Sequence, residues 1–287
     1  MDLYNIIENI MLTYFNNQMF HQPIDKIISK TTIVTRKYRF PCKIEHQIQV
    51  DNINVFLHYY GIRYINTLLY FPGGSFNDAP TILHYKFAKK LSKKLKVRVI
   101  MVQYPLFPEV DPTITTKLIR KIIKYLKLEK ISIIGDSAGA NLAVYLLESL
   151  HIDNINIIDK TILISPFIDA SLTNVYINLI NNHDFILDKN NCYKIGKQLY
   201  SKYLNGNMYL FPKTSNFKFN SQILLINGSK EIFVPDAFVW MENQKVLKVK
   251  QSIYKSMCHC FTLFPIKQAR LAIKEIRKFY LENIDNS

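Results

Sequence analysis

The chain has 287 residues, of which 48% are hydrophobic, and it carries a formal net charge of +15. This hydrophobic content predicts a globular chain, and the absence of a Pro-, Gly- or Ser-rich linker predicts a single domain over residues 1–287. The lysines are scattered and lack the aromatic partners of an RNA-binding surface, so we expect no nucleic-acid partner. Since no apolar segment could span a bilayer and the N-terminus has no basic start, we expect neither a transmembrane helix nor a signal peptide, and a cytoplasmic location.

The four cysteines do not indicate a metal site or a disulfide framework. Cys42, Cys192, Cys258 and Cys260 have no zinc-type spacing, and Cys258 and Cys260 are too close in sequence for an ordinary bridge between neighbouring strands. So few cysteines agree with a reducing compartment. We therefore expect no metal ion.

Apolar spacing predicts an alternation of strands and helices along most of the chain. One or two helices are expected within residues 1–30. Continuous or alternating apolar runs then predict strands at 43–60 (two strands around a turn at Asp51-Asn52), 65–71, 97–102, 131–134, 161–164, 222–227 and 250–254. Helical spacing predicts helices at 86–96, 114–126, 138–150 and 267–282. In the first of these helices the lysines should face water. This order predicts an α/β fold with a mostly parallel sheet that is covered by helices on both faces.

The alternation lapses between residues 169 and 220. Residues 174–180 and 192–203 have helical spacing, whereas 205–219 are loop-like. An insertion of this size beyond the strand ends would most simply form a cap over a site, so we expect a cap at about 170–220. Phe185, Ile186, Leu187 and Tyr193 would line it and favour an apolar ligand group.

The segment from Ile131 to Ala143 indicates a nucleophilic serine. A β-branched run ends at Gly135, Ser137 follows, and an amphipathic pattern begins after Gly139. Gly-x-Ser-x-Gly between a strand and a helix is typical of a nucleophile elbow, in which a sharp turn lifts the serine hydroxyl above the sheet edge. The alternative is an ordinary strand-turn-helix connection.

A serine nucleophile requires a base, and three histidines follow it in the chain. His151 falls at the end of the helix after Ser137, pointing away from the strand ends. His183 lies in the expected cap, where a base would be poorly held. His259 follows the last predicted strand by a short loop, where an elbow-type sheet places its base. We therefore predict His259 as the base, with a structural histidine as the alternative.

The orienting carboxylate should follow the penultimate strand. Glu231 lies in the turn Gly228-Ser229-Lys230-Glu231 and is the first candidate, and Asp236 is the second. Asp236 could instead cap the helix that begins near Ala237. Either acid could also be a solvated loop charge.

Backbone amides at the top of an earlier strand could form an oxyanion hole. Gly73 and Gly74 follow the apolar run that ends at Phe71, and the amide of Ala138 lies at the start of the helix after Ser137. Five of the eight glycines lie in the three predicted site turns, which favours a functional over an ordinary glycine turn.

Together these residues resemble the hormone-sensitive-lipase-like branch of α/β-hydrolase esterases, and within it steryl acetyl hydrolases and arylacetamide-deacetylase-like enzymes. The resemblance covers about residues 65–282 and rests on Gly135-Asp136-Ser137-Ala138-Gly139, on Ser165-Pro166, on Gly228 to Glu231 and on His259-Cys260-Phe261. It implies the α/β-hydrolase fold with an eight-stranded sheet, a helical cap that includes residues 1–40, and ester hydrolysis through an acyl-serine without a cofactor. Pro72 and Ser75 stand where the family's His-Gly-Gly-Gly loop has its histidine and its third glycine. Without the histidine, the loop could be less rigid than in the family. Glu231 stands where many relatives carry aspartate.

The resulting hypothesis is a serine carboxylester hydrolase acting on a small apolar ester. Ser137 would be the nucleophile, His259 the base and Glu231 the orienting acid, with Gly73, Gly74 and Ala138 forming the oxyanion hole. Amide or formamide hydrolysis by the same triad is one alternative, because fold and triad do not set the substrate. A hydrolase-like binding protein is another. Peripheral contact of the basic surface with an anionic membrane is compatible with catalysis. The sequence does not indicate an oligomeric state.

Overall fold

The computed structural model describes residues 44–107, 110, 112–203, 221–243 and 248–282. The helices predicted within residues 1–30, and the first part of the expected cap, lie outside these residues. Among the helices in the described ranges, none has the length and apolar character needed to cross a bilayer.

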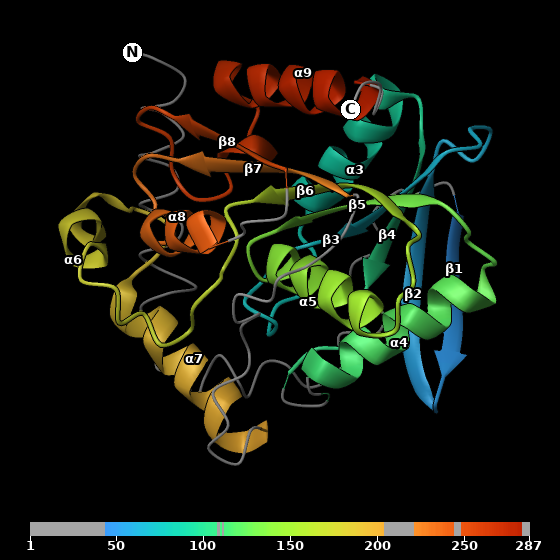
Figure 1. Cartoon of the computed structure of the whole chain (residues 1–287), viewed down its shortest axis with the longest axis horizontal. Coiled ribbons are helices and arrows are strands. Elements are labelled where there is room, and N and C mark those ends of the chain that lie inside the picture. Colours follow the sequence, from blue (N-terminus) through green and yellow to red (C-terminus); the bar gives the residue numbers. More distant parts are fainter. Residues whose placement is uncertain (1–43, 108–109, 111, 204–220, 244–247, 283–287) are drawn as a thin grey trace.

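Eight strands form one sheet in the order β1-β2-β4-β3-β5-β6-β7-β8 (Figure 1). Their bounds are β1 Ile44–Val50, β2 Ile53–Tyr60, β3 Thr67–Phe71, β4 Arg98–Gln103, β5 Ile131–Asp136, β6 Ile158–Ile164, β7 Gln222–Gly228 and β8 Val249–Tyr254. The pairs β1–β2 and β2–β4 are antiparallel, and the other neighbouring pairs are parallel. The predicted mostly parallel eight-stranded sheet is confirmed.

The helices agree with the predicted ones except at their ends. Their bounds are α3 Ile82–Leu95, α4 Pro112–Tyr125, α5 Ala138–Ile152, α6 Ile177–Ile180, α7 Lys189–Tyr203, α8 Val234–Asn243 and α9 Lys267–Leu281, with the short 3-10 helices η1 Asn181–His183 and η2 Phe261–Leu263. The largest differences are at α3, which begins four residues before the predicted start at Lys86, and at α6, which is a single turn. Lys86, Lys89 and Lys93 of α3 are exposed, as predicted.

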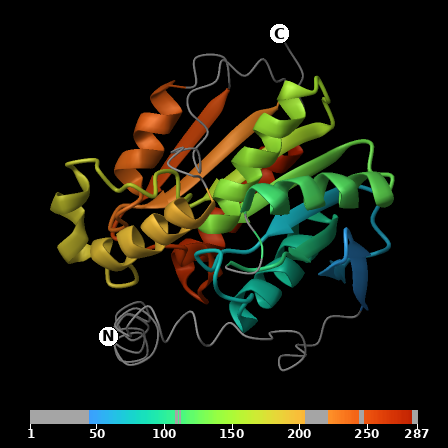
Figure 2. The ribbon, with the colours of Figure 1, turned by 90° about the horizontal axis from the view of Figure 1, so that it is seen from below.

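Alternating side chains of the strands divide the core into two layers. In β3, Leu68 and Tyr70 belong to one cluster of buried residues, whereas Leu69 and Phe71 belong to the other. Helices α3 and α9 pack on the first cluster, and α4, α5 and α8 pack on the second. Figures 1 and 2 show these helices on opposite faces of the sheet. Burial on both faces explains why the central strands read as continuous apolar runs.

The insertion between β6 and β7 packs at the carboxyl end of the sheet. Figure 1 shows α6 on the side toward which β7 and β8 point. Ile177 and Leu187 join the cluster under α3 and α9, and Ile195 of α7 joins the cluster under α4 and α5. The segment therefore contacts both layers, and its role as a cap over the site stays a prediction.

Strand β8 forms one edge of the sheet and pairs with β7. None of its six residues is buried. Glu275 of α9 braces the strand, because its carboxylate accepts hydrogen bonds from the Ser252 hydroxyl at 2.6 Å and from the Tyr254 hydroxyl at 2.8 Å. The chain leaves this strand toward His259.

Candidate active site

Ser137 lies in a sharp turn between β5 and α5. Its φ is 53° and its ψ is −121°, a backbone conformation that residues other than glycine rarely adopt. A Cβ added to Gly139 would lie 2.0 Å from the carbonyl oxygen of Phe71, so this helix can approach β3 only with glycine there. Strained residues held by their surroundings cluster at functional sites, and this turn has the predicted elbow geometry.

His259 joins Ser137 to Glu231 through its two ring nitrogens. Nε2 lies 2.9 Å from Ser137 Oγ, and Nδ1 lies 3.1 Å from Glu231 Oε2. A neutral imidazole with its proton on Nδ1 would donate to the carboxylate and accept from the serine hydroxyl. The three side chains are buried or nearly so, with 8% or less of each residue exposed. This is the arrangement that a serine nucleophile needs from its base and orienting acid.

Glu231 is held by two donors at its second oxygen. Its Oε1 accepts hydrogen bonds from the side-chain amide of Asn227 and, at 3.1 Å, from the backbone amide of Gly228. Both donors belong to the end of β7, so the strand fixes the carboxylate directly. The other oxygen, Oε2, is thereby directed at His259.

The second candidate acid, Asp236, lies elsewhere. Helix α8 begins at Val234, so Asp236 is in its first turn rather than at the N-cap that the sequence suggested. Burial raises the pKa of Asp236 to about 7, and its side chain hydrogen-bonds to Asn174. The structure therefore pairs His259 with Glu231 and not with Asp236.

The other two candidate histidines are also away from the serine hydroxyl. His151 is in the last turn of α5, and His183 ends η1 with its side chain exposed. Asp184, the next residue, is buried and tethers the insertion to the acid loop. Its Oδ1 accepts from the amides of Ile186 and Leu187, both at 3.0 Å, and its Oδ2 accepts from the amide of Ile232 at 2.9 Å.

The loop after β3 lies against the elbow. The backbone amide of Gly73 was expected to face the site, but it does not. A Cβ on Gly73 would lie 2.9 Å from Cβ of Ser137. However, the Gly73 amide donates to Asp136 Oδ2 at 3.0 Å, which corrects the expectation that this amide contributes to an oxyanion hole. Among the described residues, the amides of Gly74, Ser75 and Ala138 have no hydrogen-bond acceptor. Ser75 was not among the sequence candidates, and its signal was its place at the third glycine of the family loop.

Cys260, beside the base, is not a competing nucleophile. Its Sγ lies 3.4 Å from His259 Nε2, but burial, together with the charges of Asp136 and Glu231, raises the thiol pKa well above its usual value. A thiol in this state is neutral and unreactive at ordinary pH. Its backbone has a structural role, because the Cys260 amide donates to Ser165 Oγ at 3.0 Å and fixes the turn after His259.

The aromatic side chains around the base make its surroundings apolar. Phe233 packs edge-on against the His259 ring at 5.2 Å and stacks on Phe167 at 4.7 Å. Of the predicted cap residues, Ile186 and Leu187 are buried, Phe185 is partly buried and Tyr193 is 46% exposed. Within the described ranges, no group of three or more His, Cys, Asp or Glu side chains could hold a metal ion.

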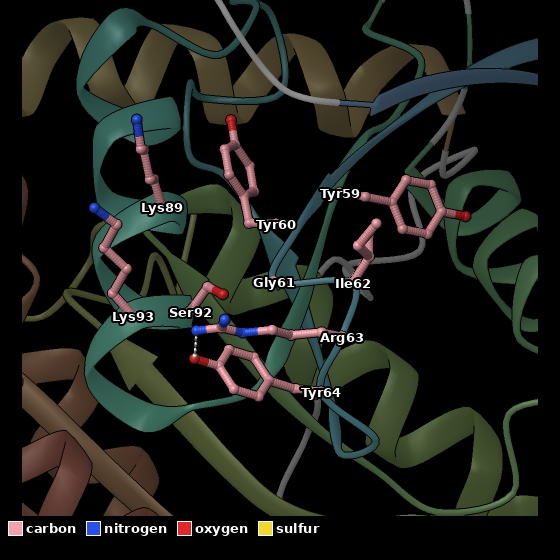
Figure 3. Close-up of a pocket in the computed structure, with 9 residues that line it drawn as sticks. All are labelled: Tyr59, Tyr60, Gly61, Ile62, Arg63, Tyr64, Lys89, Ser92 and Lys93. Atoms are coloured by element: carbon pink, nitrogen blue, oxygen red, sulfur yellow. Dashed lines mark hydrogen bonds between the residues drawn. The ribbon is translucent and has the colours of Figure 1, made fainter.

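A separate hollow of about 360 Å³ lies where β2 ends and β4 begins (Figure 3). Tyr60 lines it from the end of β2, Arg63 and Tyr64 line it from the turn that follows, and lysines of α3 line it from the other side. Tyr60 pairs with Val99 at the start of β4, whereas Ser137 follows the end of β5. The hollow is therefore distinct from the site around Ser137.

Comparison with known proteins gives a consistent result. Residues 68–263 match the alpha/beta hydrolase fold family. An esterase of Acinetobacter venetianus is 28% identical over an alignment of 217 residues, and the match covers 72% of this chain and 72% of that protein. Among solved structures, the HSL-homolog EstE7 from a metagenome library has a TM-score of 0.77 and 18% identity, and the match covers 98% of both chains. An esterase of the bacterial hormone-sensitive lipase family has a TM-score of 0.74 and 19% identity, with 91% of this chain and 98% of that chain covered.

Proposed function

The chain belongs to the alpha/beta hydrolase fold family, and from its site geometry we propose that it hydrolyses small carboxylic esters through an acyl-serine intermediate. The observation that carries this proposal is the continuous hydrogen-bonded series Ser137–His259–Glu231, with distances of 2.9 and 3.1 Å. The similarity to proteins named as esterases supports the choice of an ester as the substrate.

In the first half of the reaction, Ser137 Oγ attacks the ester carbonyl carbon while His259 Nε2 takes the hydroxyl proton. Glu231 accepts a hydrogen bond from Nδ1–H and stabilises the imidazolium that forms. The tetrahedral intermediate collapses, the ester C–O bond breaks, and His259 returns its proton to the leaving alkoxide. In the second half, water attacks the acyl-serine with His259 again as base, and the carboxylic acid leaves as Ser137 regains its proton.

The amides of Gly74, Ser75 and Ala138 are the donors that we propose for the oxyanion. These amides have no acceptor among the described residues, and they come from the two turns that meet at Ser137. Backbone amides preorganised around a developing negative charge can lower a barrier by roughly 3–4 kcal/mol for each donor. Because the donors are backbone groups, Ser75 can serve in place of glycine wherever its side chain does not obstruct the site.

An apolar acyl or alcohol group fits the surroundings of the base. Phe167 and Phe233 form a stacked pair, and the Phe233 ring lies perpendicular to the His259 ring. Such surfaces favour apolar groups, whereas a charged ester would lose its hydration there. We therefore propose short, uncharged esters as substrates.

Labelling with a fluorophosphonate tests the proposal, because this probe reacts with a serine that has an active base and an oxyanion hole. We expect the native chain to be labelled and the Ser137→Ala variant to remain folded and unlabelled. A matched pair of p-nitrophenyl butyrate and butyryl p-nitroanilide then separates ester from amide hydrolysis, with faster ester turnover expected. A folded native chain that is not labelled would contradict the proposal and favour a binding protein of hydrolase fold.

A further inference from the structure

Asp136, the residue before Ser137, has a buried carboxylate that is bound by groups from three parts of the chain. Its Oδ1 accepts from the Tyr70 hydroxyl at 2.6 Å, and its Oδ2 accepts from the Gly73 amide at 3.0 Å. His84 Nε2 lies 3.3 Å from the same Oδ2. Since Asp136 is only 1% exposed, the two hydrogen bonds and the His84 contact take the place of water around its carboxylate.

The hydrogen bonds of His84 determine which of its nitrogens carries the proton. The Thr81 amide donates to His84 Nδ1 at 2.9 Å, so this nitrogen is the acceptor. A neutral ring must then hold its proton on Nε2, which faces Asp136. His84 is 7% exposed and lies in the first turn of α3, so the helix holds Nε2 close to the carboxylate.

Two hydrogen bonds fix consecutive residues of the loop after β3. Asp136 holds the amide of Gly73, and the Tyr104 hydroxyl donates to the carbonyl of Pro72 at 2.6 Å. The peptide groups that follow, at Gly74 and Ser75, carry the proposed oxyanion donors. Their direction therefore depends on the position of the Asp136 carboxylate.

We propose that His84 is a positioning residue for the oxyanion hole: from the start of α3 it holds Asp136 Oδ2, and through that oxygen it fixes the Gly73 amide and the loop 72–75. This role compensates for proline at position 72, which offers no side-chain donor to the loop. His84 Nε2 lies 3.3 Å from Asp136 Oδ2, so a neutral ring protonated at Nε2 places a partial positive charge beside the carboxylate. The inference rests on the proposed function and adds a residue to it.

The test compares His84→Phe, which keeps a ring but removes the donor, with His84→Gln, whose amide can donate from a similar position. His58 provides a matched control, because it is also a buried histidine, 2% exposed, whose Nε2 bonds to Gln103 at 2.9 Å in strands β2 and β4. The readouts are kcat and KM for p-nitrophenyl butyrate, the rate of fluorophosphonate labelling, and the thermal unfolding midpoint.

We expect His84→Phe to lower kcat and the labelling rate about 10- to 100-fold, with KM changed by less than about threefold, because the loss falls on the transition state. His84→Gln should recover most of this loss. His58→Phe should lower the unfolding midpoint and leave kcat within about threefold of the native value. If His84→Phe does not fold, His84→Leu replaces it under the same criteria.

The outcomes separate this inference from the proposed function. A native chain that is not labelled at Ser137 overturns both. A native chain that is labelled, with a folded His84→Phe variant labelled at the same rate, overturns the role of His84 alone. An equal loss of kcat in His58→Phe would also overturn it, since the effect would then be a general consequence of removing a buried histidine.

Discussion

The Asn227 side-chain amide donates a hydrogen bond to Glu231 Oε1, four residues further along the chain, and this leaves Glu231 Oε2 to face His259. Both residues are fully buried. Strand β7, which ends just before Glu231, therefore fixes the orientation of the carboxylate that orients His259.

Replacing Asn227 by alanine should weaken catalysis without removing any residue of the triad. Glu231 would keep the Gly228 amide as the donor to Oε1 and could rotate away from His259. We expect kcat to fall about 10-fold with little change in KM, since outer partners of catalytic groups have effects of this size. Steady-state kinetics with p-nitrophenyl butyrate measure the change, and an unaltered kcat in a folded variant would contradict it.

Glutamine at position 231 should nearly abolish turnover, whereas asparagine at position 236 should not. Glu231→Gln removes the charge that stabilises the imidazolium, so we expect kcat to fall about 10³- to 10⁴-fold. Asp236→Asn should leave kcat within about threefold of the native value at pH 7, because Asp236 hydrogen-bonds to Asn174 rather than to His259. The reverse pattern of the two rates would show that the acid had been assigned to the wrong residue.

Asp236 should make the folded state less stable as pH rises. Burial raises its pKa to about 7. The folded chain therefore retains a proton that an unfolded carboxyl releases near pH 4, and the free energy of unfolding falls as pH rises from about 4 to about 7. Asp236→Asn cannot ionise, so relative to the native chain it should gain about 1 kcal/mol or more in unfolding free energy between pH 5 and pH 8.

Urea unfolding of both chains at the two pH values measures this difference. Asp51→Asn is the control, because Asp51 is an exposed carboxyl in the turn between β1 and β2. The same difference between native chain and Asp236→Asn at pH 5 and pH 8 would show that the carboxyl is not buried as described.

Asp184→Asn should loosen the contact between the insertion and the acid loop. An amide nitrogen in place of Oδ2 would face the Ile232 N–H, and neither donor would then have an acceptor. We expect the free energy of unfolding to fall by about 1–3 kcal/mol, as for a buried donor left unpaired. Because Ile232 follows Glu231, kcat should fall as well. Asp188 is a partly exposed residue before α7, so Asp188→Asn should lower the free energy of unfolding by less. Equal losses in the two variants would argue against a tethering role of Asp184.

Features that depend on neighbouring residues could be predicted from the sequence. The elbow at Ser137 was recognisable because a buried strand, two glycines and a helix follow one another within a few residues. The type of sheet could be predicted, since continuous apolar runs separated by helices imply parallel strands. Ser137, His259 and Glu231 were selected by chain order, and the structure brings their side chains into hydrogen-bonding distance.

Features that depend on contacts between distant residues could not be predicted. The Gly73 amide was expected to face the site, but it donates to the buried carboxylate of Asp136, which lies 63 positions further along the chain. The Asp136 contacts join residues on two strands and a helix, and no local pattern marks them. The alternative interpretation of Asp236 as an N-cap was wrong because α8 begins at Val234, three residues before the expected start at Ala237, and burial of its first turn was not visible in the sequence.

Because β8 is an edge strand, His259 is less firmly anchored to the sheet than Ser137 and Glu231. Serine and acid are anchored to interior strands, whereas the base is reached through a strand that has one neighbour and is fastened to α9 chiefly by Glu275. Local unfolding of an edge strand breaks fewer contacts, and costs less free energy, than unfolding of the interior strands. We therefore expect heat or denaturant to abolish activity while most of the sheet is still folded. An activity assay would then report local unfolding of β8, whereas circular dichroism would report unfolding of the rest of the sheet.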